Sequence, residues 1–176
     1  MRKIDSEKSK FIAETFCTNE KTVNDIFNIY EKISNEIKYQ YLAHPLRTIE
    51  EAVRKELKSP LFQIKCIPLN VNNINFSCAQ YFENKCYIIY FNSNADEKQI
   101  RTYIAHELGH LFIEVLAKRD VNNSISEPLS SIFGIFVMLD KNDFYSTVSQ
   151  KFTTSDWREI VSDFSILKNN GFLKKI

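Results

Sequence analysis

The sequence predicts an α+β fold in which helices precede and follow a small antiparallel sheet. Apolar residues recur at helical spacing over most of residues 1–60, alternate in short runs over residues 61–91, and return to helical spacing from about residue 97. Helices, then strands, then helices again is the order typical of an α+β domain. A length of 176 residues fits one domain, with a helical part (1–60), a core (61–140) and a helical extension (141–176).

Three helices are expected in the N-terminal part. The first covers residues 6–17, and the second covers residues 22–41, where apolar side chains fall on one face. The third begins at Thr48, because Thr48-Ile-Glu-Glu51 fits a capping box, and it ends before Ser59-Pro60.

Three strands are expected next. Leu61 to Leu69 is rich in alternating apolar residues, and asparagines then mark a turn. The runs Ile74 to Phe82 and Cys86 to Phe91 are joined by only three polar residues, Glu83 to Lys85, which suits a hairpin.

Three further helices complete the predicted fold. Asn94 offers an N-cap for a long helix that reaches about Lys118. A polar loop over residues 120–126 leads to a largely apolar helix over residues 127–139. The last helix runs from Ser155 to about Lys168, with one apolar face formed by Trp157, Ile160, Val161, Phe164 and Leu167.

Composition and charge exclude several classes of protein. Lys and Arg number 23 against 22 Asp and Glu, a net charge of +1, so no direct nucleic-acid binding is expected. The polar residues 1–10 do not resemble a signal peptide, and the apolar run Ile132 to Leu139 is too short to span a bilayer. We therefore expect a cytoplasmic protein with no membrane partner. The four cysteines show no metal-type spacing, and although Cys78 and Cys86 could face each other across the hairpin, reduced thiols are expected.

The chemistry-bearing motif is His106-Glu107-Leu-Gly-His110, on the long helix. Histidines four residues apart lie on the same helical face, so both imidazoles can bind one ion, and Zn²⁺ accepts neutral imidazole nitrogens. Glu107 flanks that face and can take a proton from water, as in HExxH metallopeptidases. Gly109 is costly inside a helix, which indicates that another element packs closely against this turn.

A zinc site of this kind needs a third protein ligand. Glu127 is the first glutamate after the motif helix and is the preferred candidate. Alternatively, Glu127 could simply be an acidic residue in the first turn of a helix, where the helix dipole favours negative charge. The following Pro128 is tolerated in a first turn because the N–H groups there have no partner within the helix. Asp120 and His44 are further candidates, and Glu114 is a weaker one because it lies on the same helix as both histidines.

Three segments together resemble the ImmA/IrrE-type metallopeptidases. They are the strand Cys86 to Asn92, the segment Arg101 to His110 with its Ala-His-Glu-Leu-Gly-His sequence, and the segment Glu127 to Leu139. The resemblance covers residues 75–140 and implies a zincin-like fold and a cytoplasmic zinc endopeptidase, of the kind associated with mobile elements and stress responses. Such proteins act on a helix-turn-helix repressor as partner.

The segment after the motif helix departs from the family pattern. If Phe133-Gly134 is aligned with the family's Phe-Ala, its usual ligand glutamate falls on Leu129. Two helical positions differ by a rotation of about 200°, so Glu127 and Leu129 cannot both face one metal. Either Glu127 binds in a different register, or the third ligand is lost.

Two functional hypotheses follow. In the first, Zn²⁺ is held by His106, His110 and Glu127, Glu107 is the general base, and Tyr103 is either an oxyanion donor or a packed aromatic residue. The substrate is then a protein, such as a transcriptional repressor. In the alternative, the protein is a weak or inactive zincin-like relative that binds and sequesters a regulatory partner.

Overall fold

The computed structural model describes residues 4–37, 45–72, 76–117, 123–139, 157–167 and 173–175. These residues form helices and a small sheet, which confirms the predicted α+β class. The elements in chain order are α1 (Ser6–Thr15), α2 (Glu20–Ile37), α3 (Pro45–Leu57), β1 (Gln63–Leu69), β2 (Ser77–Phe82), β3 (Cys86–Asn92), α4 (Glu97–Leu111), the π-helical turn η1 (Phe112–Leu116), α5 (Asn123–Leu139), α6 (Trp157–Leu167) and β4 (Leu173–Lys175).

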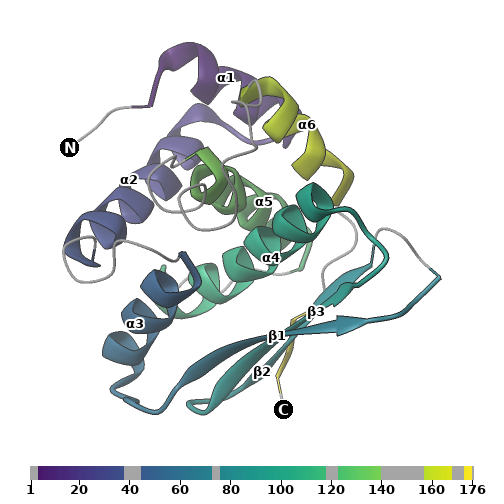
Figure 1. The fold of residues 1–176 in the computed structure, drawn as a ribbon. Helices are drawn as coiled ribbons and strands as arrows, with labels where there is room; N and C mark the ends of the chain where they lie inside the picture. Colours follow the sequence, from purple (N-terminus) through teal and green to yellow (C-terminus); the bar gives the residue numbers. More distant parts are fainter. Residues whose placement is uncertain are drawn as a thin grey trace.

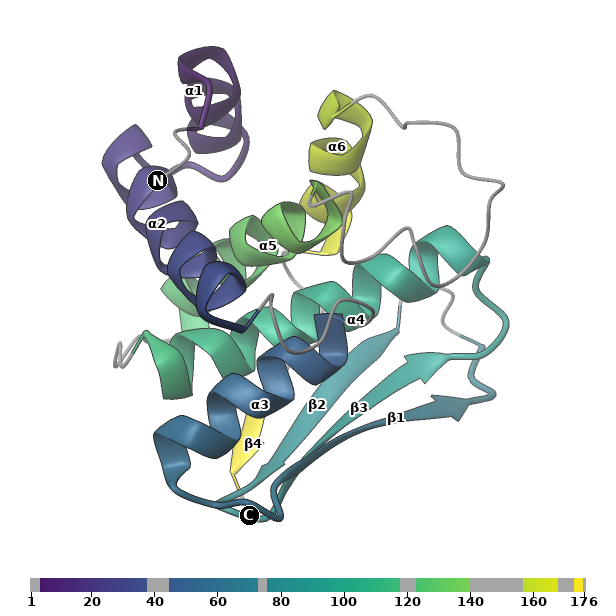
Figure 2. The ribbon, with the colours of Figure 1, turned by 60° about the vertical axis from the view of Figure 1, so that its left-hand side comes forward.

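The helices lie on one face of the sheet (Figure 1). Helix α4 crosses directly above the strands, and α2, α5 and α6 lie on its far side, as Figure 2 shows from another direction. Alternate side chains of β2 and β3 point into this layer, and Tyr87 and Ile89 are fully buried there. Helix α4 therefore lies in the interior, between the sheet and the outer helices.

The sheet is mixed, so the prediction of an antiparallel sheet was wrong in this respect. Its strand order is β1-β3-β2-β4, and only the β2–β3 hairpin is antiparallel. Strand β1 pairs in parallel with β3, and β4 pairs in parallel with β2. The predicted helical extension after residue 140 contains helix α6, but it also contributes β4, which was not predicted.

Several helix boundaries differ from the predictions. Helix α3 begins at Pro45, so Thr48 lies inside the helix and is not its cap. The cap of α4 is Asp96 rather than Asn94, and its side chain forms a capping box with Gln99. Helix α5 begins at Asn123, four residues before the expected start. Pro128 therefore lies inside the helix and not in its first turn.

The predicted apolar face of α6 is confirmed. Ile160, Val161, Phe164 and Leu167 are buried, and Trp157 packs edge-on against Phe11 of α1 at a ring-centroid distance of 5.3 Å. Residues 168–172, between α6 and β4, lie outside the described residues.

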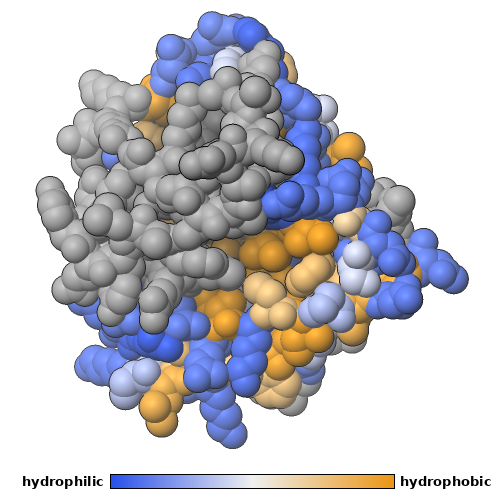
Figure 3. All heavy atoms as spheres, in the orientation of Figure 1, coloured by the Kyte–Doolittle hydropathy of each residue, from blue (hydrophilic) through white to orange (hydrophobic). Residues whose placement is uncertain are grey.

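The surface combines polar and apolar regions. Hydrophilic residues cover the α1 end of the face drawn in Figure 3, and hydrophobic residues gather in the middle of that face. All four cysteines lie in the described part of the chain, and none of them forms a disulfide bond. The β2–β3 register pairs Cys78 with Tyr90, so Cys78 and Cys86 do not face each other. None of the described helices is both long enough and apolar enough to cross a membrane.

Candidate metal centre

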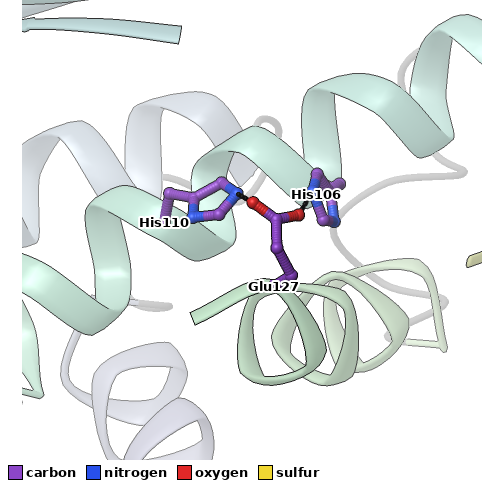
Figure 4. Close-up of side chains that lie close together, drawn as sticks. All are labelled: His106, His110 and Glu127. Atoms are coloured by element: carbon purple, nitrogen blue, oxygen red, sulfur yellow. Dashed lines mark hydrogen bonds and ion pairs between the residues drawn. The ribbon is translucent and has the colours of Figure 1, made fainter. Parts of the chain in front are cut away.

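The two motif histidines lie one turn apart on the buried part of α4. His106 is fully buried and His110 is 2% exposed. Their ring centroids are 4.9 Å apart and the ring planes are almost perpendicular, at 89°. Both side chains point toward α5, where they meet a carboxylate (Figure 4). The spacing of four residues therefore places both imidazoles on one face of α4, as helical geometry predicts.

That carboxylate belongs to Glu127. One of its oxygens, Oε2, lies 3.2 Å from His106 Nε2, and the other, Oε1, lies 3.3 Å from His110 Nε2. Leu129 is 3% exposed and belongs to the hydrophobic core. Of the two registers considered for this helix, the structure has the one in which Glu127 faces the histidines.

The donor set and its spacing fit a metal ion. Two imidazole nitrogens and one carboxylate oxygen all lie within 4.8 Å of one another. A tetrahedral ion with ligands at about 2.0–2.1 Å separates any two of them by about 3.3 Å, and each imidazole nitrogen lies at about that distance from one of the two Glu127 oxygens. His110 Nε2 is also buried without a hydrogen-bond partner in the described part of the chain, as expected for an atom that binds an ion. His106, His110 and Glu127 can therefore hold a metal ion.

Three serines of α5 contact the other nitrogens of the same imidazole rings. Ser131 Oγ lies 3.0 Å from His106 Nδ1. Ser126 Oγ and Ser130 Oγ each lie 3.0 Å from His110 Nδ1. Sequence reasoning missed these serines. For Ser130 and Ser131 the available signal was their spacing, because residues three and four positions beyond Glu127 share its helical face.

Glu107 is fully buried between α4 and strand β2. Its Oε1 accepts a hydrogen bond of 2.7 Å from the hydroxyl of Ser77, and its Oε2 has no hydrogen-bond partner in the described residues. The Tyr87 hydroxyl donates to the Glu107 backbone carbonyl at 2.7 Å, which fixes this turn of α4 to β3. One carboxylate oxygen is thus held, and the other is available.

The electrostatics of these groups are coupled. Burial raises the pKa of Glu107, and the two histidines and Ser77 offset this only in part. Burial would raise the pKa of Glu127 as well, but its contacts with both imidazoles outweigh burial and lower that pKa. Burial lowers the pKa of His110, but Glu127 and neighbouring carboxylates outweigh this, so the net pKa is raised. The histidine–carboxylate group therefore favours the ionised form of Glu127.

Gly109 permits the close packing of α4 on α5. A Cβ atom at this position would lie 2.3 Å from the backbone oxygen of Ser130 and 2.6 Å from its Cα. The expectation that another element packs against this turn is confirmed. Because the neighbour is backbone of the helix that carries Glu127, this contact sets the distance between the Glu127 carboxylate and the two histidines.

The remaining candidate residues do not join this group. Tyr103 is 1% exposed and packs with Ala95 and Leu167, so the interpretation as a packed aromatic residue is correct. Glu114 lies in η1 and is not in the metal-binding group found among the described residues. His44 and Asp120 lie outside the described residues.

Comparisons with known proteins add no further constraint on the site. No family model, no curated protein and no solved structure matches this chain.

Proposed function

We propose that the protein is a cytoplasmic zinc-dependent endopeptidase that cleaves a regulatory protein such as a helix-turn-helix repressor. The observation that carries the proposal is the convergence of His106, His110 and Glu127, with the Glu107 carboxylate in the same turn of α4. The resemblance of the motif segments to ImmA/IrrE-type metallopeptidases supports this choice of substrate class.

Zinc is the metal that the donor set favours. Two imidazole nitrogens and one carboxylate are a common ligand set of catalytic zinc sites, which leave a further position open. Magnesium and calcium prefer oxygen ligands only, and no thiolate lies in the group. When bound, zinc supplies a Lewis acid that polarises a carbonyl and makes water nucleophilic near neutral pH.

Glu107 would move the proton in this reaction. Its held oxygen, Oε1, fixes the carboxylate through Ser77, so that Oε2 can accept a proton from the attacking water. The same carboxyl group then delivers that proton to the leaving amine. A pKa raised by burial suits both steps, because a general base works best when its pKa is near the operating pH.

The test compares wild type with Glu107→Gln. Each zinc-loaded protein is incubated with candidate helix-turn-helix repressors, and cleavage is followed by intact-mass spectrometry. We expect wild type to cleave one of them, and Glu107→Gln to bind about one zinc per chain without cleaving. Cleavage by Glu107→Gln at the wild-type rate would refute the mechanism. Glu31→Gln, the same change at a buried glutamate of α2, is the matched control.

One observation favours the alternative of a binding protein. The side chains of His106, Glu107 and His110 are at most 2% exposed, so a protein substrate would reach them only after a rearrangement. A protein that only sequesters a regulatory partner, and in which the zinc ion is structural, would not require that rearrangement. Capture of a full-length partner by both wild type and Glu107→Gln would support this alternative.

A further inference from the structure

A cavity lies between α6 and the N-terminal half of α4, which are neighbours in Figure 1. Four of its lining residues come from α4 and three come from α6. Its volume is about 70 Å³, several times the roughly 10–15 Å³ that one water molecule needs. Ile166, one of the lining residues, is 60% exposed, so the cavity is open to solvent. It can therefore receive a side chain from another molecule.

Part of the cavity wall is apolar. Tyr103 and Leu167 are at most 2% exposed and pack together, and the mostly exposed Ile166 lies in the same wall. An aliphatic chain that covers this surface removes it from water, which favours binding. A ligand of this cavity therefore needs an apolar part.

The charged part of the wall has an excess of negative charge. Lys98 and Asp163 line the cavity, and Lys98 Nζ lies 2.9 Å from Asp163 Oδ2 and 2.6 Å from Glu159 Oε1. Burial alone would lower the pKa of Lys98, but the two carboxylates outweigh burial and raise that pKa. One ammonium is thus shared by two carboxylates, and the three side chains have a formal net charge of −1 at neutral pH. Each carboxylate has further lone pairs and can accept another hydrogen bond, so a cation is favoured here.

The cavity lies on the same face of α4 as the metal-binding group. Thr102 and Tyr103 precede His106 by four and three residues, which is about one helical turn. One turn advances about 5.4 Å along the helix axis, and an extended peptide advances about 3.3 Å per residue. A peptide that lies along α4 with its scissile bond at His106 would therefore bring a side chain one or two residues away to the cavity.

We infer that this cavity is a specificity subsite for a lysine or arginine side chain of the protein substrate. The inference rests on the proposed function, and it adds the kind of residue that the substrate presents within two positions of the cleaved bond. The aliphatic stem of such a side chain lies against Tyr103 and Ile166, and its charged head pairs with Asp163. Lysine and arginine are abundant on proteins that bind DNA, so a repressor offers such side chains.

The first test measures peptide binding by NMR, so it does not depend on cleavage. Four peptides, acetyl-Ala-Ala-Xaa-Ala-Ala-amide, carry arginine, lysine, norleucine or glutamate at Xaa, and mass spectrometry checks that they stay intact. Norleucine keeps the aliphatic stem of lysine without its charge. We expect the arginine and lysine peptides to shift the amide signals of Thr102, Tyr103 and Ile166, and to bind about two- to fivefold more tightly than the norleucine peptide. Equal affinity for lysine and norleucine, or unmoved cavity signals with all four peptides, would overturn the inference.

The second test reverses the charge of the cavity. The double variant Glu159→Gln, Asp163→Asn changes the formal charge of the group from −1 to +1, because Lys98 remains. We expect this variant to bind the norleucine peptide more tightly than the lysine and arginine peptides. The control Glu14→Gln, Asp25→Asn makes the same two changes on α1 and α2, which do not line the cavity, and should keep the wild-type order. The wild-type order in the first variant would overturn the role of the two carboxylates.

The cleavage assay separates this inference from the proposed function. Where wild type cuts a repressor, the cut should lie within two residues of a lysine or arginine. Replacing that residue by methionine should raise KM with little change in kcat, as expected for lost binding. A cut with no basic residue nearby would overturn the subsite. No cleavage of any repressor, with the arginine peptide still bound at the cavity, would refute the proposed function and leave the cavity as a site for a basic side chain of a bound partner.

Discussion

Replacing Gly109 by alanine tests whether the packing of α4 on α5 sets the metal site. From helix propensity alone, Gly109→Ala should stabilise the protein by about 1 kcal/mol. The added Cβ, however, would lie 2.3 Å from Ser130 O, about 1 Å inside the 3.4 Å lower limit of ordinary contact. Because this neighbour is helix backbone, no side-chain rotation can relieve the overlap.

The magnitude follows from these two opposing effects. Overpacking costs about 1–3 kcal/mol, occasionally more, and a rigid backbone neighbour places this substitution at the upper end. After subtracting the gain in propensity, we expect the free energy of unfolding to fall by about 2 kcal/mol. A shift of α5 by about 1 Å also exceeds the roughly 0.5 Å that a functional site tolerates, so zinc should bind at least about tenfold more weakly.

Urea unfolding of the metal-free protein, followed by circular dichroism, measures the first effect, and chelator competition measures the second. Gly134→Ala is the comparison, because its Cβ would mainly meet the Phe164 ring, at 2.4 Å, which can move. We expect Gly134→Ala to lose stability but to keep an affinity closer to that of wild type. A Gly109→Ala protein that is more stable than wild type, with unchanged zinc affinity, would refute the reasoning.

Three further predictions concern the same region. In the metal-free protein, the folded-state pKa of His110 lies above its ordinary value of 6.5, so its stabilising contribution is complete below that value and is lost as the pH rises through the raised pKa. Urea unfolding at a series of pH values should therefore show the free energy of unfolding falling above pH 6.5, and His110→Gln should reduce this fall. A free energy of unfolding that rises with pH in wild type would contradict the prediction. Tyr87→Phe removes the hydrogen bond to the Glu107 carbonyl and should cost about 1 kcal/mol in the same assay, whereas no loss would show that this buried bond contributes little. Leu129→Glu placed in a Glu127→Ala background should not restore zinc binding by elemental analysis, because position 129 faces the core, and recovered zinc would show that the register is wrong.

The helical and strand blocks could be predicted because periodicity is a local property. The apolar faces of α2 and α6 recur every three to four residues, and the β2–β3 hairpin is marked by a three-residue polar connection. The parallel pairing of β1 with β3 could not be predicted in this way, since it depends on which side of the hairpin β1 approaches. Strand β4 has three residues, too few for a periodic signal.

The same distinction between local patterns and long-range contacts applies to the candidate site. His106, Glu107 and His110 follow from spacing within one helix, so the sequence was sufficient to identify them. Glu127 depends on the rotation of α5, which is determined by the burial of Leu129 and by the contact with Gly109. Ser130 has no signal beyond its spacing from Glu127, and a serine that faces solvent could have the same spacing.

The central claim is that the chain binds zinc through His106, His110 and Glu127. Protein purified without chelators should contain about one zinc per chain by elemental analysis, whereas His110→Ala and Glu127→Ala, prepared in parallel, should contain almost none. A folded wild-type protein that takes up no zinc when the metal is offered would contradict the central claim. Full zinc content in both variants would contradict the assignment of the ligands.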